Sequence, residues 1–208
     1  MPDYIAIGDI HGMDSLLVQL LEKLPTDGEI IFLGDYIDRG PQSRAVITHL
    51  LQLQQQRLCH FLRGNHEAIL LSSLDGNTDM RNFWLRNGGL QTLESYDREI
   101  PPTHEEFFRR TLPYYTTDAY IFVHAGLVPG RTLEEIGPDE FLWIREPFLS
   151  TDYNWGKVVI HGHTPTRKFP PQIYPNRINV DTGAVFGGAL TAVLLPEYEF
   201  ISIPASAG

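Results

Sequence analysis

The chain has 208 residues, of which 42% are hydrophobic and 20% charged, and its net charge is −10. This length predicts one globular domain over residues 1–208, large enough to bury about 70% of its unfolded surface. The negative charge argues against nucleic acid as a main partner, no apolar run is long enough to cross a membrane, and a single cysteine excludes an internal disulfide.

The first third of the chain alternates between strand and helix patterns. Strands are expected at residues 3–8, 29–33 and 57–62, and helices at 13–24 and from Pro41 to Leu53. Leucines spaced for one helical face occupy the first helix, and Pro25 ends it. Successive strand–turn–helix units predict parallel strand pairing with right-handed crossovers.

The rest of the chain has shorter elements. Residues 68–112 read as several short helices with glycine breaks, forming a compact cap. Strands are expected at 119–123 and 157–160, and then, as antiparallel strands, around 173–174, 178–180, 190–195 and 200–203. The pattern as a whole predicts an α/β fold.

Five polar clusters each follow an apolar run that we expect to be a strand. They are Gly8–Gly12, Gly34–Gly40, Arg63–Glu67, His124–Gly126 and His161–Thr164. In open α/β sheets, the loops at the carboxyl ends of strands converge on one crevice, so side chains far apart in sequence meet there. The clusters supply carboxylates, imidazoles, a carboxamide and arginines, which together predict a two-metal site for cleaving phosphate esters.

Asp9 and His11 stand two residues apart and therefore point to the same side of an extended segment. Asp35 is a second carboxylate placed directly after a strand, and we expect it to bridge two cations. The second cation takes its remaining ligands from later clusters, namely Asn65, His124 and either His161 or His163. Oxygen and nitrogen ligands without a thiolate favour manganese or iron, and zinc or cobalt also fit.

The same clusters predict a reaction. Water bound between two cations loses a proton near neutral pH, and the hydroxide can attack phosphorus in line. Arginine forks suit the charge that develops on phosphate oxygens, and the candidates are Arg39, Arg63 and Arg145. His66 is placed to give the leaving group its proton, with Asp38 orienting the imidazole.

Three of these clusters, Gly8–Gly12, Gly34–Gly40 and Arg63–Glu67, resemble the signature blocks of the phosphoprotein phosphatases within the calcineurin-like metallophosphoesterases. Trp143–Glu146 and Asp181–Gly188 resemble the small bacterial and phage lambda-type branch. The resemblance implies a metallophosphoesterase fold, with a central mixed β-sandwich flanked by helices. It also implies the following ligand sets: Asp9, His11 and Asp35 on one metal, and Asp35, Asn65, His124 and His163 on the other.

The expected function is hydrolysis of phosphoserine and phosphothreonine in proteins, with phosphotyrosine as a further substrate, by a cytoplasmic enzyme. A symmetrical dinucleoside tetraphosphatase, or another nucleotide or small-molecule phosphatase, is the alternative. Symmetrical enzymes of that kind usually carry glutamine at the position of His11, which favours a phosphoprotein or phosphopeptide substrate. A binding module without catalysis is disfavoured because every expected position is filled. The sequence leaves the oligomeric state open, and a monomer is consistent with it.

Overall fold

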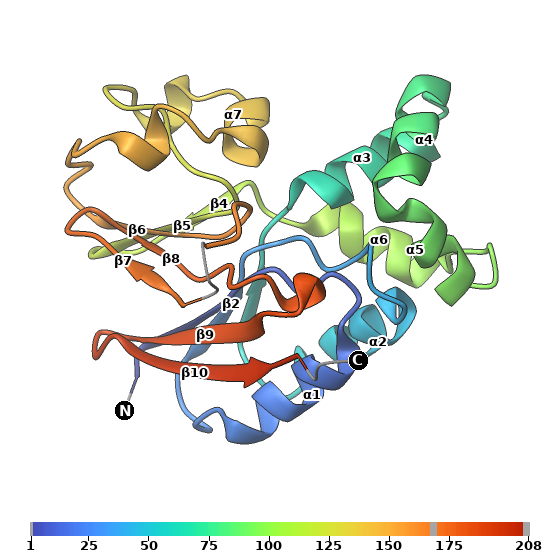
Figure 1. Ribbon diagram of the computed structural model, residues 1–208, viewed down its shortest axis with the longest axis horizontal. Helices are drawn as coiled ribbons and strands as arrows, with labels where there is room; N and C mark the ends of the chain where they lie inside the picture. The colour runs from blue at the N-terminus through green and yellow to red at the C-terminus, as the bar shows by residue number, and fades with distance from the viewer. Residues whose placement is uncertain (1, 167–169, 206–208) are drawn as a thin grey trace.

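A computed structural model of the chain describes residues 2–166 and 170–205. Two five-stranded sheets pack face to face, and helices cover the outer face of each, as Figure 1 shows. The predicted α/β architecture, a mixed β-sandwich flanked by helices, is confirmed. Within the described residues, no helix has the length and apolar character needed to cross a membrane.

The first sheet has the order β10-β9-β1-β2-β3. Its strands are β1 (Tyr4–Ile7), β2 (Glu29–Phe32), β3 (Cys59–Phe61), β9 (Ala189–Leu195) and β10 (Glu199–Pro204). β1, β2 and β3 pair in parallel, as predicted, and α1 (Asp14–Lys23) and α2 (Ser43–Leu53) form their crossovers. β9 runs antiparallel to both β1 and β10.

The second sheet has the order β4-β5-β6-β8-β7. Its strands are β4 (Tyr114–Thr116), β5 (Tyr120–Val123), β6 (Val158–His161), β7 (Gln172–Ile173) and β8 (Arg177–Asn179). β7 and β8 pair antiparallel, as expected, but β8 also pairs in parallel with β6, so the expectation of antiparallel pairing was wrong on that side of the strand. The reason is that β7 turns the chain round before β8 enters the sheet, which restores the direction of β6.

Alternation along β1 shows how the layers form. Ala6 faces the second sheet and packs in a cluster with residues of β5, β6 and β8. Ile5 and Ile7 point to the opposite face, where they meet the apolar sides of α1 and α2. This two-sided burial follows from the two-residue period of a strand and explains why β1 is apolar throughout.

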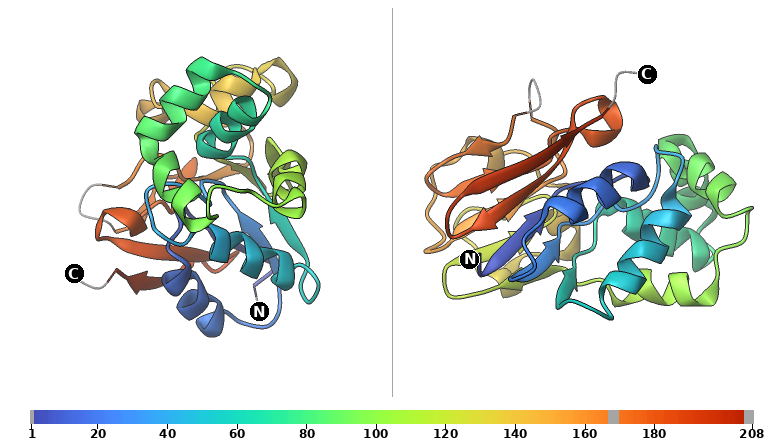
Figure 2. Two further views of the ribbon diagram at one scale, coloured as in Figure 1. Left: turned by 90° about the vertical axis from the view of Figure 1, so that its right-hand side faces the viewer. Right: turned by 90° about the horizontal axis from the view of Figure 1, so that it is seen from below.

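The segment between β3 and β4 forms a lobe of short helices, which the right-hand view of Figure 2 shows to one side of the sheets. Its helices are α3 (Asn65–Leu74), α4 (Thr78–Trp84), α5 (Leu90–Ser95) and α6 (Pro102–Arg110), and a kink at Leu85–Gly89 separates α4 from α5. The prediction of short helices with a glycine break at residues 88–89 is confirmed.

The outer face of the second sheet is covered by α7 (Pro138–Trp143) and its flanking loops, through Phe141 and Phe148. Three 3₁₀ turns complete the described elements: Leu133–Glu135, Phe148–Ser150 and Ala184–Phe186. The helical lobe and α7 thus stand at either side of the ends of β1, β2, β5 and β6, where the polar clusters lie (Figure 1).

Candidate metal centre and active site

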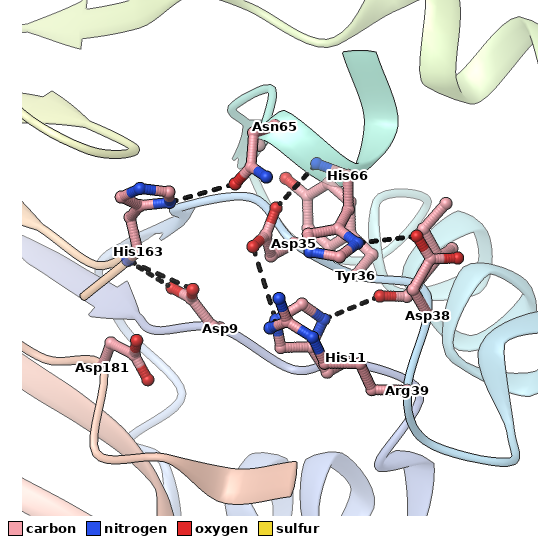
Figure 3. A network of polar contacts seen from close by, with 12 residues as sticks. Asp9, His11, Asp35, Tyr36, Asp38, Arg39, Asn65, His66, His163 and Asp181 are labelled. Carbon is pink, nitrogen blue, oxygen red and sulfur yellow. Dashed lines mark hydrogen bonds and ion pairs between the residues drawn. The ribbon is translucent and has the colours of Figure 1, made fainter. Parts of the chain in front are cut away.

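The polar clusters converge on one cavity, of about 230 Å³, between the helical lobe and α7. The predicted residues that line it are Asp35, Arg39, Asn65, His66, Arg145 and His163. Asp9, His11, Asp38 and His124 lie behind this lining and are almost completely buried. Figure 3 shows most of these side chains pointing toward a common centre.

The loops that carry these residues have an unusual backbone. Positive φ angles occur at His11, Asp35, Asp38, Arg39 and His163, although none of these is glycine. Such conformations are costly and persist only where the surroundings enforce them, which is typical of functional sites.

Glu67 holds the backbone of the loop that contains Asp35 in its conformation. Its buried carboxylate accepts hydrogen bonds from the backbone N–H groups of Asp35 at 2.8 Å, Tyr36 at 2.9 Å and Gly64 at 3.0 Å. Burial and the nearby Asp35 carboxylate raise the pKa of Glu67 to about 8. Sequence reasoning gave Glu67 no role, because its partners are backbone groups that only the folded loops bring within reach.

His11, Asp35 and His66 form a first group of possible metal ligands, whose donor atoms lie within 4.8 Å of one another. His11 Nδ1 lies 2.8 Å from the Ile37 carbonyl, to which it donates. Its Nε2 is therefore an acceptor, 3.4 Å from Asp35 Oδ2 and 2.5 Å from the Arg39 guanidinium. Burial lowers the pKa of His11 to about 3, which leaves the neutral imidazole that metals bind.

Asp35, His124 and His163 form a second such group. His124 Nδ1 donates to the Leu33 carbonyl at 2.9 Å, so Nε2 faces the site as an acceptor. This Nε2 lies 3.0 Å from Asn65 Oδ1 and 3.5 Å from Asp35 Oδ1, both of which are also acceptors. Acceptors gathered this closely in a buried site are the arrangement that a cation between them would satisfy.

His163 completes the second group. Its Nδ1 lies 3.0 Å from Asn65 Oδ1, and its buried Nε2 has no partner among the described residues. Burial and the neighbouring His124 lower the pKa of His163 to about 3. The neutral ring, whose Nδ1 faces Asn65 and the common centre, fits a metal ligand.

Asp9 lies at the edge of these groups, with both carboxylate oxygens 3.1 Å from the backbone N–H of His163. Burial and the carboxylates of Asp181 and Asp35 raise the pKa of Asp9 well above its usual value. Burial also raises the pKa of Asp181, to about 7. Carboxylates this crowded and this buried suit divalent cations, whose charge would offset theirs. The sequence analysis gave Asp181 no ligand role. This residue follows β8 of the second sheet.

The residues therefore fit a pair of divalent cations. Asp35 belongs to both groups, as expected of a bridging carboxylate, and the remaining donors are imidazoles, carboxylates and an amide. The prediction of bound divalent metal is supported at this level, whereas the identity of the metal stays a prediction.

His66 belongs to a buried network with Asp38. His66 Nδ1 lies 2.7 Å from Asp38 Oδ2, and Trp84 Nε1 donates to both Asp38 oxygens at 2.9 Å. Thr92 Oγ1 also donates to Asp38 Oδ1, at 2.6 Å. Burial lowers the pKa of His66, but the carboxylates of Asp35 and Asp38 outweigh burial and hold its pKa above the ordinary value. The sequence did not predict a role for Trp84 or Thr92, because both lie in the helical lobe, outside the polar clusters.

The three predicted phosphate-binding arginines are placed differently. Arg39 and Arg145 line the cavity, and Arg145 Nε lies 3.4 Å from Thr164 Oγ1. Arg63 does not line it. Its guanidinium donates instead to Thr111 Oγ1 at 2.9 Å and to the Arg109 carbonyl at 3.0 Å, at the end of α6.

His161 stays outside both ligand groups. It is fully buried, its ring stands edge-on to Phe148, and burial lowers its pKa to about 3. Tyr36 is also fully buried, and its hydroxyl donates to the Leu62 carbonyl at 2.7 Å. Both residues support neighbouring structure instead of lining the cavity.

Fold and site together define a metal-dependent phosphoesterase, and comparison with known families agrees. The model of the calcineurin-like phosphoesterase family matches residues 3–198, and the chain belongs to this family. It is therefore a hydrolase of the metallophosphoesterase superfamily. The resemblance seen in the sequence is confirmed at this level.

The names of individual relatives specify an activity more narrowly than the family does. The chain is 31% identical to bis(5'-nucleosyl)-tetraphosphatase PrpE (asymmetrical) of Geobacillus sp. strain WCH70, over 96% of this chain and 93% of that protein. It is 30% identical to the protein of the same name from Halalkalibacterium halodurans, over 96% and 92% of the two chains. Among solved structures, one described as "a putative diadenosine tetraphosphatase" matches with a TM-score of 0.79 at 23% identity, covering 100% and 97%.

The tetraphosphatase relatives at about 30% identity overturn the expectation of a protein serine/threonine phosphatase and of a phosphoprotein substrate, which was wrong. Structures of a cold-active protein tyrosine phosphatase also match, at 19% identity, and like the match at 23% identity they show the fold alone. The error has a physical origin. His11 lies in a buried group of candidate metal ligands and touches Asp35 and Arg39, so its identity bears on the candidate metal and phosphate site. It carries no information on what is attached to that phosphate.

Proposed function

We propose that this protein hydrolyses dinucleoside polyphosphates, cleaving the phosphate chain of a bis(5'-nucleosyl) tetraphosphate asymmetrically. The observation that carries the proposal is the set of relatives of that name, about 30% identical over nearly the whole chain. The site supports the same chemistry, because a metal-binding cavity lined by two arginines suits a substrate with several phosphate charges.

The proposed metal ligands are the predicted ones: Asp9, His11, Asp35, Asn65, His124 and His163. Two divalent cations, with Mn²⁺ as our first choice, would lower the pKa of water and neutralise phosphate charge. Arg39 and Arg145 would hold the non-bridging oxygens of the phosphate under attack.

His66 would supply the proton for the leaving oxygen from Nε2, because its Nδ1 is held by Asp38 at 2.7 Å. The carboxylate keeps the ring oriented and favours its protonated form. The leaving group of a phosphoanhydride is a phosphate oxygen, which needs this proton less than an alkoxide does. The network around His66 thus allows the site to act on esters as well as on anhydrides.

The test is a direct comparison of substrates, with Mn²⁺ added to the purified protein. We expect kcat/KM for diadenosine tetraphosphate to exceed that for a phosphoserine peptide, and the nucleotide products to be of unequal phosphate length. Two identical diphosphate products would contradict asymmetrical cleavage. Turnover of the peptide but not of the dinucleotide would overturn the proposal.

A further inference from the structure

A second cavity, which we call the junction groove, lies beside the catalytic cavity, along the junction between α4 and α5. Its volume is about 960 Å³, compared with about 230 Å³ for the catalytic cavity. Arg39 and Asn87 line both, so the two cavities adjoin. The other walls of this junction groove combine a cation, an amide and apolar side chains, namely Leu85, Arg86, Leu90 and Gln91.

Backbone contacts hold the junction groove against the loop that carries Arg39. Asn87 and Gly88 depart from helical geometry, with Gly88 at a φ of 106°. The Gly88 carbonyl accepts a hydrogen bond from Arg39 N at 3.2 Å, and a Cβ on Gly88 would lie only 2.6 Å from that nitrogen. Asn87 Nδ2 donates to the Phe83 carbonyl at 2.8 Å. Groove and catalytic cavity are therefore joined by direct backbone contact at this kink between the two helices.

The charge of the groove is opposite to that of the protein. Its walls contain two arginines, Arg39 and Arg86, and no acidic side chain. Neither arginine forms an ion pair with a carboxylate anywhere in residues 2–166 or 170–205. In a chain with a net charge of −10, unpaired cations beside a phosphate-binding cavity favour a ligand with further negative charge.

Size points the same way. A cavity of about 230 Å³ is below the range of about 300–1,000 Å³ that holds whole small-molecule ligands. It accommodates the reacting phosphate and its neighbours but not two nucleosides. The junction groove supplies the missing space, and Leu90, 50% exposed, offers a nucleobase an apolar surface.

We propose that the junction groove binds the nucleotide half of a dinucleoside polyphosphate that is remote from the reacting phosphate. Arg86 would hold phosphate oxygens beyond those on Arg39, and the base would lie against Leu90. This inference rests on the proposed function and identifies the residues that distinguish a dinucleotide from a simple phosphate ester.

The experiment compares Arg86→Ala with Arg81→Ala. Arg81 is also an exposed arginine of the same lobe, but it lines neither cavity. For each variant, kcat/KM is measured on diadenosine tetraphosphate and on p-nitrophenyl phosphate, which has no second half to bind. We expect Arg86→Ala to lower kcat/KM for the dinucleotide about tenfold more than for the small ester, mainly through KM, as for loss of one charge-assisted contact. Arg81→Ala should affect both substrates equally.

Leu90→Asp gives an independent check, because it places a negative charge on the proposed base surface without touching the metal cavity. It should raise KM for the dinucleotide at least as much as Arg86→Ala does. If both variants change the two substrates equally, the groove assignment is overturned while dinucleotide hydrolysis stands. If the unmodified protein fails to turn over the dinucleotide but cleaves the small ester, the proposed function and this inference both fail.

Discussion

At the scale of single residues, His66 is a candidate both for the proton donor and for a metal ligand. His66 is held at Nδ1 by Asp38 at 2.7 Å, yet it is also close enough to His11 and Asp35 to count among possible ligands. Its partner favours the role of acid, because a carboxylate at Nδ1 stabilises the protonated ring. Substitution can decide between the two roles.

We expect His66→Asn to lower kcat by about 10²–10⁴-fold on an alkyl phosphate, whose leaving alkoxide needs a proton. The loss should be smaller on diadenosine tetraphosphate and on p-nitrophenyl phosphate, whose leaving oxygens are more acidic. Steady-state kinetics on the three substrates, with metal content measured in parallel, checks this. Loss of metal from the variant would instead make His66 a ligand.

Trp84 contacts Asp38, which is the hydrogen-bond partner of the proposed acid His66. Trp84→Phe removes the indole N–H that donates to Asp38 and leaves a buried carboxylate with one donor fewer. We expect the free energy of unfolding to fall by about 1–3 kcal/mol more than in Trp155→Phe, measured in urea. Trp155 is the matched control, because its buried Nε1 has no partner among the described residues. Equal losses would mean that the bond to Asp38 contributes nothing to stability.

At the scale of elements, the kinked turn at Leu85–Gly89, between α4 and α5, joins the helical lobe to the loop that carries Arg39. Gly88 makes this possible, because its backbone approaches Arg39 N more closely than any side chain would allow. The turn therefore places Arg39, and with it one wall of the cavity, by direct backbone contact.

Gly88→Ala tests this contact against Gly76→Ala. Both glycines have positive φ, 106° and 93°, so each alanine carries a conformational cost of about 1–2 kcal/mol. A Cβ at Gly76 meets nothing within 4 Å, whereas at Gly88 it would force Arg39 to move. We expect Gly88→Ala to be the more destabilising of the two in urea and to raise KM for the dinucleotide. Similar unfolding midpoints and unchanged KM would show that the contact is unimportant.

At the scale of the whole molecule, the candidate metal centre draws its residues from both sheets of the sandwich. Asp9 and Asp35 follow strands of the first sheet, whereas His124 and His163 follow strands of the second. Cations bound between them would therefore stabilise the packing of one sheet on the other, in addition to serving the reaction.

We expect Mn²⁺ to raise the melting temperature and EDTA to lower it, with stabilisation of about 2.7 kcal/mol when free metal is a hundredfold above its dissociation constant. Asp35→Asn should abolish most of this shift, because the residue belongs to both ligand groups. His49→Gln is the control, since His49 pairs with Asp14 outside the centre. A full shift in Asp35→Asn would refute the shared carboxylate.

Metal content gives a separate measurement. Asp9→Asn and His124→Ala should each lower the metal bound per chain, determined by elemental analysis, whereas His49→Gln should not. Asp9 is the sharper case, because its carboxylate lies outside both groups and accepts from the His163 backbone. Unchanged metal in Asp9→Asn would make it a positioning residue for His163.

The sequence by itself determined the parallel β1–β2–β3 unit and the family, because apolar periodicity and strand-end clusters are local patterns. It also predicted most of the side chains that meet at the cavity, since loops at strand ends converge, but not that Arg63 lies outside it. It missed the parallel entry of β8, which depends on how the chain turns at β7.

Only the tertiary structure brought Glu67, Trp84 and Thr92 to the catalytic loops and turned Arg63 toward α6. These contacts join residues that are far apart in the sequence, so no periodic pattern of residues predicts them. The substrate class was corrected by comparison with relatives, because the short motifs do not report it. Metal and phosphate ligands are short motifs, whereas the space beside them is shaped by packing of the helical lobe, which no motif describes.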